Sequence, residues 1–129
     1  AIRNAETCRV DDRLVLTRGN LFDGVTRCFE VLVSNTPYIP ANDEKDLQPE
    51  VRDYEPHRAL FAGLDGLDMI RRLVREAPYH LNARGNILIE IGFGQESHVR
   101  ELFDESLWEK PVFLPDFQGI PRIAAAKLK

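Results

Sequence analysis

The sequence contains little cysteine and no evident set of metal ligands. Its two cysteines, Cys8 and Cys28, lie far apart, and neither belongs to a Cys-x-x-Cys or Cys/His spacing. The three histidines, His57, His80 and His98, are scattered along the chain. Both cysteines are therefore expected to be free thiols, and we predict neither a disulfide framework nor a bound metal.

Long apolar stretches and an excess of positive charge are also lacking. No run approaches about eighteen consecutive apolar residues, the length that can cross a membrane as a helix. The opening residues, AIRNAETCRV, lack the charged and then apolar pattern of a signal peptide. The net charge of −4 and the pI near 5.4 give no general attraction to nucleic acid. We therefore expect a soluble cytoplasmic protein that binds neither membranes nor nucleic acid.

Size and composition indicate one globular domain. The chain has 129 residues, of which 43% are hydrophobic and 29% charged, and these are ordinary globular values. It does not begin with methionine, and residues 1–8 resemble the end of a helix that has no N-cap before it. We therefore expect residues 1–129 to form a single, partial domain cut from a longer chain.

Hydrophobic patterns predict alternating strands and helices. Short runs of apolar and β-branched residues predict strands, whereas apolar residues at helical spacing predict helices. The predicted strands are Arg13–Arg18, Phe29–Val33, Asn86–Ile91, Val112–Leu114 and Ile123–Leu128, and the predicted helices are 65–81, ended by residues 82–85, and Gln95–Glu105. This order predicts an α/β protein with a sheet layered with helices. Residues 36–64 contain four prolines and no sustained period, so we predict a lid or substrate loop there.

In sheets of this kind, ligands bind beyond the carboxyl ends of the strands. That rule places Asn20, Asn35 and the turn after Ile91 along one edge, where we expect the functional site. Gly92-Phe93-Gly94 in that turn has the position of a phosphate or cofactor loop, but Ser97 stands where a third glycine or an alanine is needed. We therefore do not assign it that role.

Asn35-Thr36-Pro37-Tyr38 offers a defined set of polar groups at the end of a strand. The Asn35 amide carries an acceptor, Pro37 restricts Thr36 and so directs the Thr36 carbonyl, and Tyr38 adds a flat apolar face. Two acceptors and a ring suit a planar NH2 group, which they could orient toward an electrophilic methyl group. An ordinary proline-containing turn is the alternative interpretation of the same residues.

Four segments resemble one enzyme family, and together they cover nearly the whole chain. They are VSNTPYI at 33–39, DLQPEVRDYEPHRALFAGLDGLD at 46–68, ILIEIGFGQ at 87–95 and DFQGIPR at 116–122. In this order they resemble the protein-glutamine N5-methyltransferases, which modify peptide chain release factors in translation termination. The resemblance implies a Rossmann-like class I methyltransferase sheet, S-adenosyl-L-methionine as cofactor, and a release factor glutamine in a Gly-Gly-Gln loop as substrate.

The resemblance also implies roles for individual residues. Asn35 accepts one N–H of the substrate amide and contacts the methyl donor, the carbonyl of Thr36 accepts the other N–H, and Tyr38 lines the pocket with Pro37. The family's usual motif is Asn-Pro-Pro-Tyr, so Thr36 is a departure that is expected to loosen the turn more than abolish binding. Asn20 matches a position near the adenine of the cofactor, although a plain turn residue fits it equally well.

Two loop residues and one missing part complete these expectations. Glu55 and Pro56 match the substrate-pocket block, although a solvated loop carboxylate is an equal interpretation of Glu55. The family's first two strands, with the glycine-rich cofactor turn, have no counterpart here, so the chain is expected to be a C-terminal portion. Their absence should leave exposed sheet edges, and an isolated chain should then self-associate or misfold.

Two alternative functions remain at this point. A DNA or RNA amino-methyltransferase uses a related Asn-Pro-Pro-Tyr-type pocket, but the acidic balance and the segment 46–68 argue against it. A catalytically inactive binding module derived from a methyltransferase is favoured by the missing cofactor turn. The retention of Asn35, Pro37 and Tyr38 favours an active enzyme instead.

Overall fold

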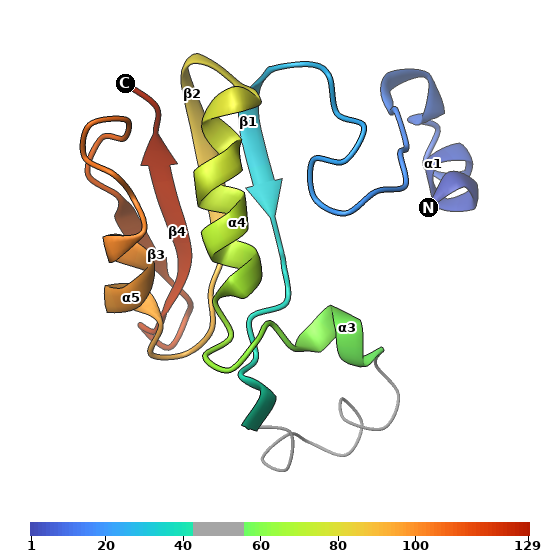
Figure 1. Ribbon diagram of the computed structural model, residues 1–129. Coiled ribbons are helices and arrows are strands. Elements are labelled where there is room, and N and C mark those ends of the chain that lie inside the picture. Colours follow the sequence, from blue (N-terminus) through green and yellow to red (C-terminus); the bar gives the residue numbers. More distant parts are fainter. Residues whose placement is uncertain (43–55) are drawn as a thin grey trace.

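The computed structural model describes residues 1–42 and 56–129, and its elements alternate between helices and strands (Figure 1). In chain order they are α1 (Ile2–Thr7), the 3-10 turn η1 (Asp11–Arg13), β1 (Phe29–Ser34), α3 (His57–Leu60), α4 (Asp68–Glu76), the 3-10 turn η3 (Ala77–Tyr79), β2 (Leu81–Glu90), α5 (Glu96–Glu101), β3 (Val112–Pro115) and β4 (Pro121–Lys127). No helix among the described residues is long and apolar enough to cross a bilayer. Cys8 and Cys28 are free and exposed.

The four strands form one mixed sheet in the order β1-β2-β4-β3. β1 and β2 are parallel, and the chain passes between them through α4, as a parallel pair requires a crossover connection. β4 pairs antiparallel with both β2 and β3, so the last strand in the sequence is an inner strand of the sheet. This mixed α/β sheet confirms the predicted fold class.

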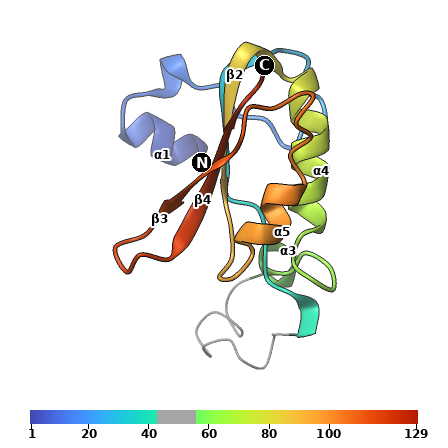
Figure 2. The ribbon, with the colours of Figure 1, turned by 90° about the vertical axis from the view of Figure 1, so that its left-hand side faces the viewer.

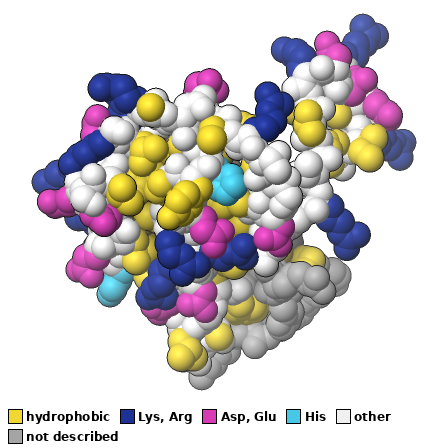
Figure 3. All heavy atoms as spheres, turned by 45° about the horizontal axis from the view of Figure 1, so that its top comes forward, with side chains coloured by type: hydrophobic (Ala, Val, Ile, Leu, Met, Phe, Trp, Pro, Cys, Tyr) yellow, Lys and Arg dark blue, Asp and Glu magenta, His cyan; other side chains and the backbone are white. Residues whose placement is uncertain are grey.

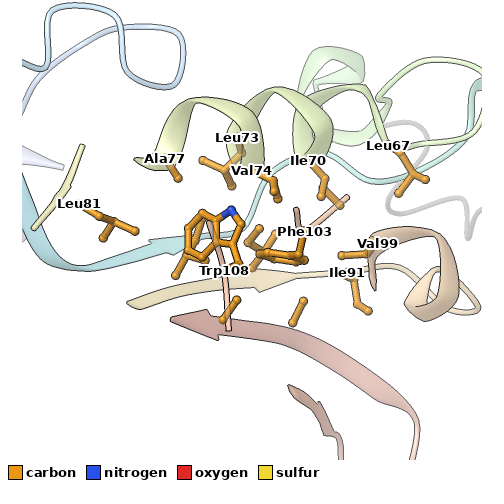
Figure 4. Packing of buried hydrophobic residues seen from close by; sticks show 14 residues of the cluster. Leu67, Ile70, Leu73, Val74, Ala77, Leu81, Ile91, Val99, Phe103 and Trp108 are labelled. Carbon is orange, nitrogen blue, oxygen red and sulfur yellow. The ribbon is translucent and has the colours of Figure 1, made fainter. Parts of the chain in front are cut away.

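The core lies between one face of the sheet and the helices α4 and α5 (Figures 1 and 2). Alternate residues of β2, Ile87 and Ile89, are fully buried against this layer, because successive strand side chains point to opposite faces. Burial of one such side chain contributes about 1.5–3 kcal/mol. Trp108 lies in the middle of the cluster and meets the ring of Phe103 edge-on at 5.4 Å (Figure 4).

A row of apolar residues crosses the other face of the sheet, where no described helix packs on it. Val33 on β1 pairs with Leu88 on β2, Leu88 pairs with Ala125 on β4, and Ala125 pairs with Val112 on β3. Val33 is 78% exposed and Val112 59% exposed. We call this row of residues the open face. The exposed apolar surface expected beside β1 is therefore present.

Charged side chains of both signs are interspersed on the surface. In the view of Figure 3, Lys and Arg side chains lie beside Asp and Glu side chains, and hydrophobic side chains are exposed between them. On α4 this mixing is explicit, because Arg72 is paired with Glu76 at 2.9 Å and with Asp23 at 3.3 Å. The helical face rich in arginine is therefore neutralised by neighbouring carboxylates.

The predicted strand at Arg13–Arg18 is wrong. Residues 14–18 follow η1 and form no ladder with any described residue, although Leu14 has extended backbone angles of φ −114° and ψ 136°. Val15 is 81% exposed. A strand is defined by its partner, because each extended residue must place its N–H and C=O groups on a neighbour. The residue pattern carries β propensity, but the described chain supplies no partner.

Both predicted helices are shorter than the pattern indicates. α4 ends at Glu76, and Pro78 lies in the 3-10 turn that follows. Residues 82–85, expected to end the helix, belong to β2 instead. They form an irregularity in the ladder, where pairing moves from Phe29 with Leu81 to Val31 with Asn86, and Arg84 adopts a φ of 64°. Tertiary pairing with β1 thus overrides the local turn signal.

The second helix ends early because a side chain captures the backbone after it. α5 ends at Glu101 rather than Glu105. The Asp104 carboxylate accepts a hydrogen bond from the N–H of Ser106 at 2.8 Å, and the Asp104 carbonyl accepts one from Leu107 at 3.0 Å. Such a local turn competes with helix continuation.

The open face predicts self-association of the isolated chain. We expect sedimentation velocity of residues 1–129 to show concentration-dependent oligomers, because the exposed row through Val33 and Val112 gains free energy by leaving water. The double variant Val33→Lys with Val112→Lys should shift the distribution toward monomer. Leu64→Lys, at an exposed position in a loop, is the matched control and should not. A stable monomer of the unchanged chain at all concentrations contradicts this prediction.

Candidate functional site

The polar tetrapeptide that follows β1 borders a small cavity. β1 ends at Ser34, and Asn35 to Tyr38 then line a space of about 150 Å³ together with Ala59 and Leu60. Ala59 and Leu60 belong to α3, so the short helix forms the opposite wall. Asn35 is exposed, whereas the ring of Tyr38 is half-buried. The Asn35 side chain is thus available at the carboxyl end of β1.

A larger cleft of about 750 Å³ adjoins the small cavity. Its walls come from the loop after β1, the loop before α4, the turn after β2 with the start of α5, and the start of β4. They comprise Tyr38, Ile39, Pro40, Asp65, Leu67, Gly92, Phe93, Gly94, Gln95, His98 and Arg122. Tyr38 and Ile39 line both spaces. A ligand in the cleft therefore lies within reach of the tetrapeptide, at the carboxyl ends of β1 and β2.

Tyr38 is held by its hydroxyl as well as by its backbone. The hydroxyl donates a hydrogen bond to Oε1 of Glu90, at the end of β2, over 3.0 Å. Burial raises the pKa of Tyr38 above 10, and the bond to the Glu90 carboxylate raises it further. Tyr38 is therefore a neutral phenol near pH 7, with its ring fixed between the two cavities.

A buried amide, that of Gln95, connects the three loops of the cleft. Gln95 is 8% exposed, and its Oε1 accepts a hydrogen bond from the Gly92 N–H at 2.8 Å. Its Nε2 donates to the carbonyl of Tyr38 at 2.9 Å and to the carbonyl of Asp65 at 3.3 Å. Sequence reasoning missed this residue. Its position directly after Gly-Phe-Gly, inside a segment that resembles the family, was the available signal.

Asp65 fixes the loop that leads into α4. Its carboxylate accepts hydrogen bonds from the Leu67 N–H at 3.1 Å and from Arg71 at 3.0 Å. The bond from Arg71 lowers the pKa of Asp65 from 3.8 to about 2, and the Leu67 N–H contributes in the same direction. Gly66 beside it has a φ of 75°, and a side chain there would collide with the Tyr38 carbonyl oxygen. This loop therefore packs directly on the backbone of the tetrapeptide.

Thr36 is the one buried polar residue in the tetrapeptide. It is 6% exposed, and its hydroxyl oxygen has no hydrogen-bond partner among the described residues. A hydroxyl removed from water without a partner costs about 1–3 kcal/mol. Thr36 thus carries an energetic cost that proline, the residue of the resembled motif, does not.

Asn20 does not share an edge with Asn35, so this expectation is wrong. Asn20 opens a turn in which its carbonyl accepts a hydrogen bond from Asp23. Phe22 in that turn stacks on His80 at 4.3 Å, and the His80 carbonyl accepts a hydrogen bond from Phe29, the first residue of β1. The six residues of β1 span about 20 Å at the usual rise per residue, so Asn35 lies at the far end of the strand from this turn.

The remaining predicted pocket residues lie in or beside the substrate loop. Glu55 lies outside the described residues. Pro56 is exposed and precedes α3, where its carbonyl accepts a hydrogen bond from the Ala59 N–H at 2.7 Å. It does not line either cavity. Ile39 pairs with Phe61 in an isolated bridge, which ties the start of this loop to its end.

The unpaired Thr36 hydroxyl predicts a stabilising substitution. We expect Thr36→Val to raise the free energy of unfolding by about 1 kcal/mol, because valine has the same shape without a buried hydroxyl. Urea denaturation of the protein measures this. Thr36→Ser, which keeps the hydroxyl and loses the methyl group, is the control and should not be stabilising. Equal or lower stability of the valine variant contradicts the prediction.

The lowered pKa of Asp65 predicts a specific loss of stability in acid. Because the native state holds the carboxylate in its charged form, its stabilising effect is present above pH 3.8 and is lost as the pH falls toward about 2. Asp65→Asn should flatten the dependence of the urea midpoint on pH in that window. Asp12→Asn, in the exposed N-terminal segment, is the charge-matched control. An unchanged profile for Asp65→Asn argues against the assignment.

Comparison with known proteins identifies relatives along nearly the whole chain. A release factor glutamine methyltransferase of Geobacter sulfurreducens is 41% identical over 99% of this chain, which corresponds to 45% of that protein. One from Cereibacter sphaeroides is 40% identical over 99% of this chain and 46% of that protein. A ribosomal protein uL3 glutamine methyltransferase of Bradyrhizobium diazoefficiens is 41% identical over 90% of this chain and 35% of that protein. No family model matches the chain.

Solved structures show the same relationship. A release factor-specific protein-(glutamine-N5) methyltransferase from Alicyclobacillus acidocaldarius superposes with a TM-score of 0.53 at 26% identity, covering 82% of this chain and 52% of that one. A methyltransferase from Pyrococcus furiosus, at 20% identity, has a TM-score of 0.64 over 98% of this chain and 54% of that one, and shows the fold alone.

The chain spans about half the length of the curated relatives that it matches. Its sheet is that of class I methyltransferases, and the predicted lack of a counterpart to the first part of that fold agrees with the partial coverage. Over nearly its whole length the chain is therefore homologous to release factor glutamine methyltransferases, and it corresponds to a part of their fold.

Proposed function

We propose that the protein containing this chain transfers a methyl group from S-adenosyl-L-methionine to the side-chain nitrogen of a glutamine in a peptide chain release factor, in the cytoplasm. This chain supplies the pocket for the substrate amide. The observation that carries the proposal is the placement of an exposed Asn35 at the carboxyl end of β1, on a cavity that it shares with Tyr38. The homology of the whole segment to glutamine methyltransferases supports it.

The chemistry requires orientation more than strong base catalysis. A carboxamide nitrogen is a poor nucleophile, because its lone pair is delocalised into the carbonyl. The Asn35 side-chain oxygen and the Thr36 carbonyl each accept a hydrogen bond from one of its N–H groups. Together they turn the nitrogen toward the methyl group. The nitrogen forms a bond to the methyl carbon while the carbon–sulfur bond of the donor breaks, and the excess proton leaves the nitrogen afterwards.

Tyr38 completes the pocket as a neutral, fixed ring. Its hydroxyl is committed to Glu90, so the ring face rather than the hydroxyl meets the substrate. A flat apolar face against a planar amide excludes water and restricts rotation of the amide. Because the pKa of Tyr38 is raised above 10, its phenol stays protonated at any physiological pH and takes no proton from the substrate.

The described residues fit the cofactor only in part. S-adenosyl-L-methionine supplies an electrophilic methyl group on a sulfonium, and among the described residues we assign the contact with it to Asn35. A role for Asn20 near the adenine stays a prediction from the resemblance alone. The turn that contains Asn20 packs on His80, beside the first residue of β1. Gly92-Phe93-Gly94 is unsuited to a phosphate or carboxylate, since the Gly92 N–H is already donated to Gln95.

The larger cleft is the proposed site for the polypeptide that carries the glutamine. Its volume of about 750 Å³ exceeds what one side chain fills, and it opens beside Tyr38. A glutamine on a loop lying in this cleft can extend past Tyr38 to Asn35. Exposed Phe93 and the glycine backbone on either side of it offer contacts to an extended, small-residue loop.

One other substrate, ribosomal protein uL3, has specific support, and experiment separates it from the release factor. The uL3 glutamine methyltransferase relative is as similar in sequence as the release factor relatives, although over less of the chain. A putative rRNA methylase of Clostridium thermocellum shares the fold at 14% identity and a TM-score of 0.63, which shows the fold alone. A further alternative is a binding module that lacks catalysis. Such a protein would bind a release factor without transferring a methyl group to it.

The test is methyl transfer by the complete protein. With labelled S-adenosyl-L-methionine, we expect label in a release factor and none in the same factor with its Gly-Gly-Gln glutamine replaced, in uL3, or in DNA and RNA. Asn35→Ala should lower the rate about 100-fold or more, since it removes one of two groups that orient the amide. Folding should be unaffected at this exposed position.

Asn4→Ala, at an exposed position of α1, is the matched control and should keep the normal rate. Label in uL3 but not in the release factor would replace the substrate and keep the chemistry. Label in nucleic acid, or a near-normal rate for Asn35→Ala, would overturn the proposed function.

A further inference from the structure

We propose that Gln95 is a positioning residue for the substrate amide: its buried side chain holds the loop Asn35 to Tyr38 in the geometry that methyl transfer requires. The inference rests on the proposed function, because its effect on the reaction is exerted through Tyr38. Gln95 itself touches neither the small cavity nor Asn35.

The side chain of Gln95 uses its donors and its acceptor on three separate loops. Its Nε2 donates to the carbonyls of Tyr38 and Asp65, and its Oε1 accepts from Gly92. The residue is only 8% exposed, so water does not readily replace its hydrogen-bond partners. A buried amide that pairs three backbone groups stabilises one arrangement of the loops, because any other arrangement leaves at least one of those groups unpaired.

The packing around this amide leaves little room for adjustment. A side-chain carbon added to Gly92 would lie 3.0 Å from Oε1 of Gln95 and 3.1 Å from the Tyr38 ring. One added to Gly66 would lie 2.8 Å from Nε2 of Gln95 and would also collide with the Tyr38 carbonyl. Gly66 therefore has no room for a side chain, and one at Gly92 would require Gln95 or Tyr38 to shift by a few tenths of an ångström.

The link from Gln95 to the reaction is short. The carbonyl that Gln95 holds belongs to Tyr38, two residues after the Thr36 carbonyl that is proposed to accept a substrate N–H. Pro37 between them has a fixed φ, so displacement of Tyr38 is transmitted to Thr36 rather than absorbed. On the far side, the Ile39 N–H is fixed by the Leu60 carbonyl at 3.0 Å. The Ile39 carbonyl also accepts a hydrogen bond from the Ala62 N–H at 3.1 Å, so Gln95 fixes this backbone on one side and the bridge at Ile39 fixes it on the other.

The first variant removes the tie and keeps an apolar side chain of related size. In Gln95→Leu of the complete protein we expect kcat/KM for release factor methylation to fall about 10- to 100-fold, with most of the change in kcat, because misplacement by about 1 Å costs that much. Gln118→Leu, in an exposed turn, is the matched control and should behave as the unchanged protein.

The second variant distinguishes positioning from a merely structural role. Gln95→Glu keeps the acceptor for Gly92, loses both donors at pH 8, and regains one when the buried acid is protonated. The measured quantity is the kcat of the variant divided by the kcat of the unchanged protein at the same pH. This ratio should therefore rise about fivefold or more when the pH is lowered from 8 to 6. The same ratio for Gln95→Leu should stay flat, and Gln118→Glu should track the unchanged protein throughout.

A readout without activity separates this inference from the proposed function. Hydrogen exchange of the Gly92 amide should accelerate at least tenfold in Gln95→Leu, which lacks an acceptor, and stay slow in Gln95→Glu, which keeps one. Kinetic constants of Gln95→Leu within twofold of normal, or a pH profile of Gln95→Glu parallel to the normal one, would overturn the positioning role. Failure of the unchanged protein to methylate any glutamine would overturn the proposed function instead, and the exchange result would still report whether the tie exists.

Discussion

The parallel pairing of β1 with β2 is the constraint on which the rest of the site depends. It aligns Ser34 with Ile89, so that the loop after β1 and the turn after β2 leave the sheet at the same edge. The pairing is held by α4, which crosses between the two strands and buries Ile87 and Ile89 against its apolar side. Without this register, Tyr38 and Gln95, which are 57 positions apart, would have no reason to meet.

The site beyond that edge is built mainly from polar bonds between loops rather than from apolar packing. Tyr38 is bound through its hydroxyl to Glu90 and through its carbonyl to Gln95, and Asp65 joins the same group through its carbonyl. Loops of this kind contribute little apolar area, so directional hydrogen bonds must determine their positions. This gives a rigid frame around a cleft that is open to a large ligand.

Hydrogen bonding also explains the effect of Thr36, which stands where the family's motif has proline. The expected function of that residue lies in its carbonyl, which threonine keeps. The side chain is buried and its hydroxyl is unpaired, so the departure costs stability rather than removing a group that acts on the substrate. The open face has a different origin, since a row of one apolar residue from each of the four strands implies a covering layer that the described residues do not provide.

The sequence alone determined the fold class, most of the strands and the position of the candidate pocket, because apolar runs, prolines and the Asn-Thr-Pro-Tyr stretch are local signals. It did not determine whether residues 14–18 pair as a strand, where the helices end, or that residues 82–85 join β2, because those outcomes depend on a partner elsewhere in the chain. The separation of Asn20 from Asn35 and the central place of Gln95 were likewise decided only by tertiary structure. A side-chain amide has the same local propensity whether it faces water or pairs with three distant backbone groups, so its role depends on which loops the sheet brings together.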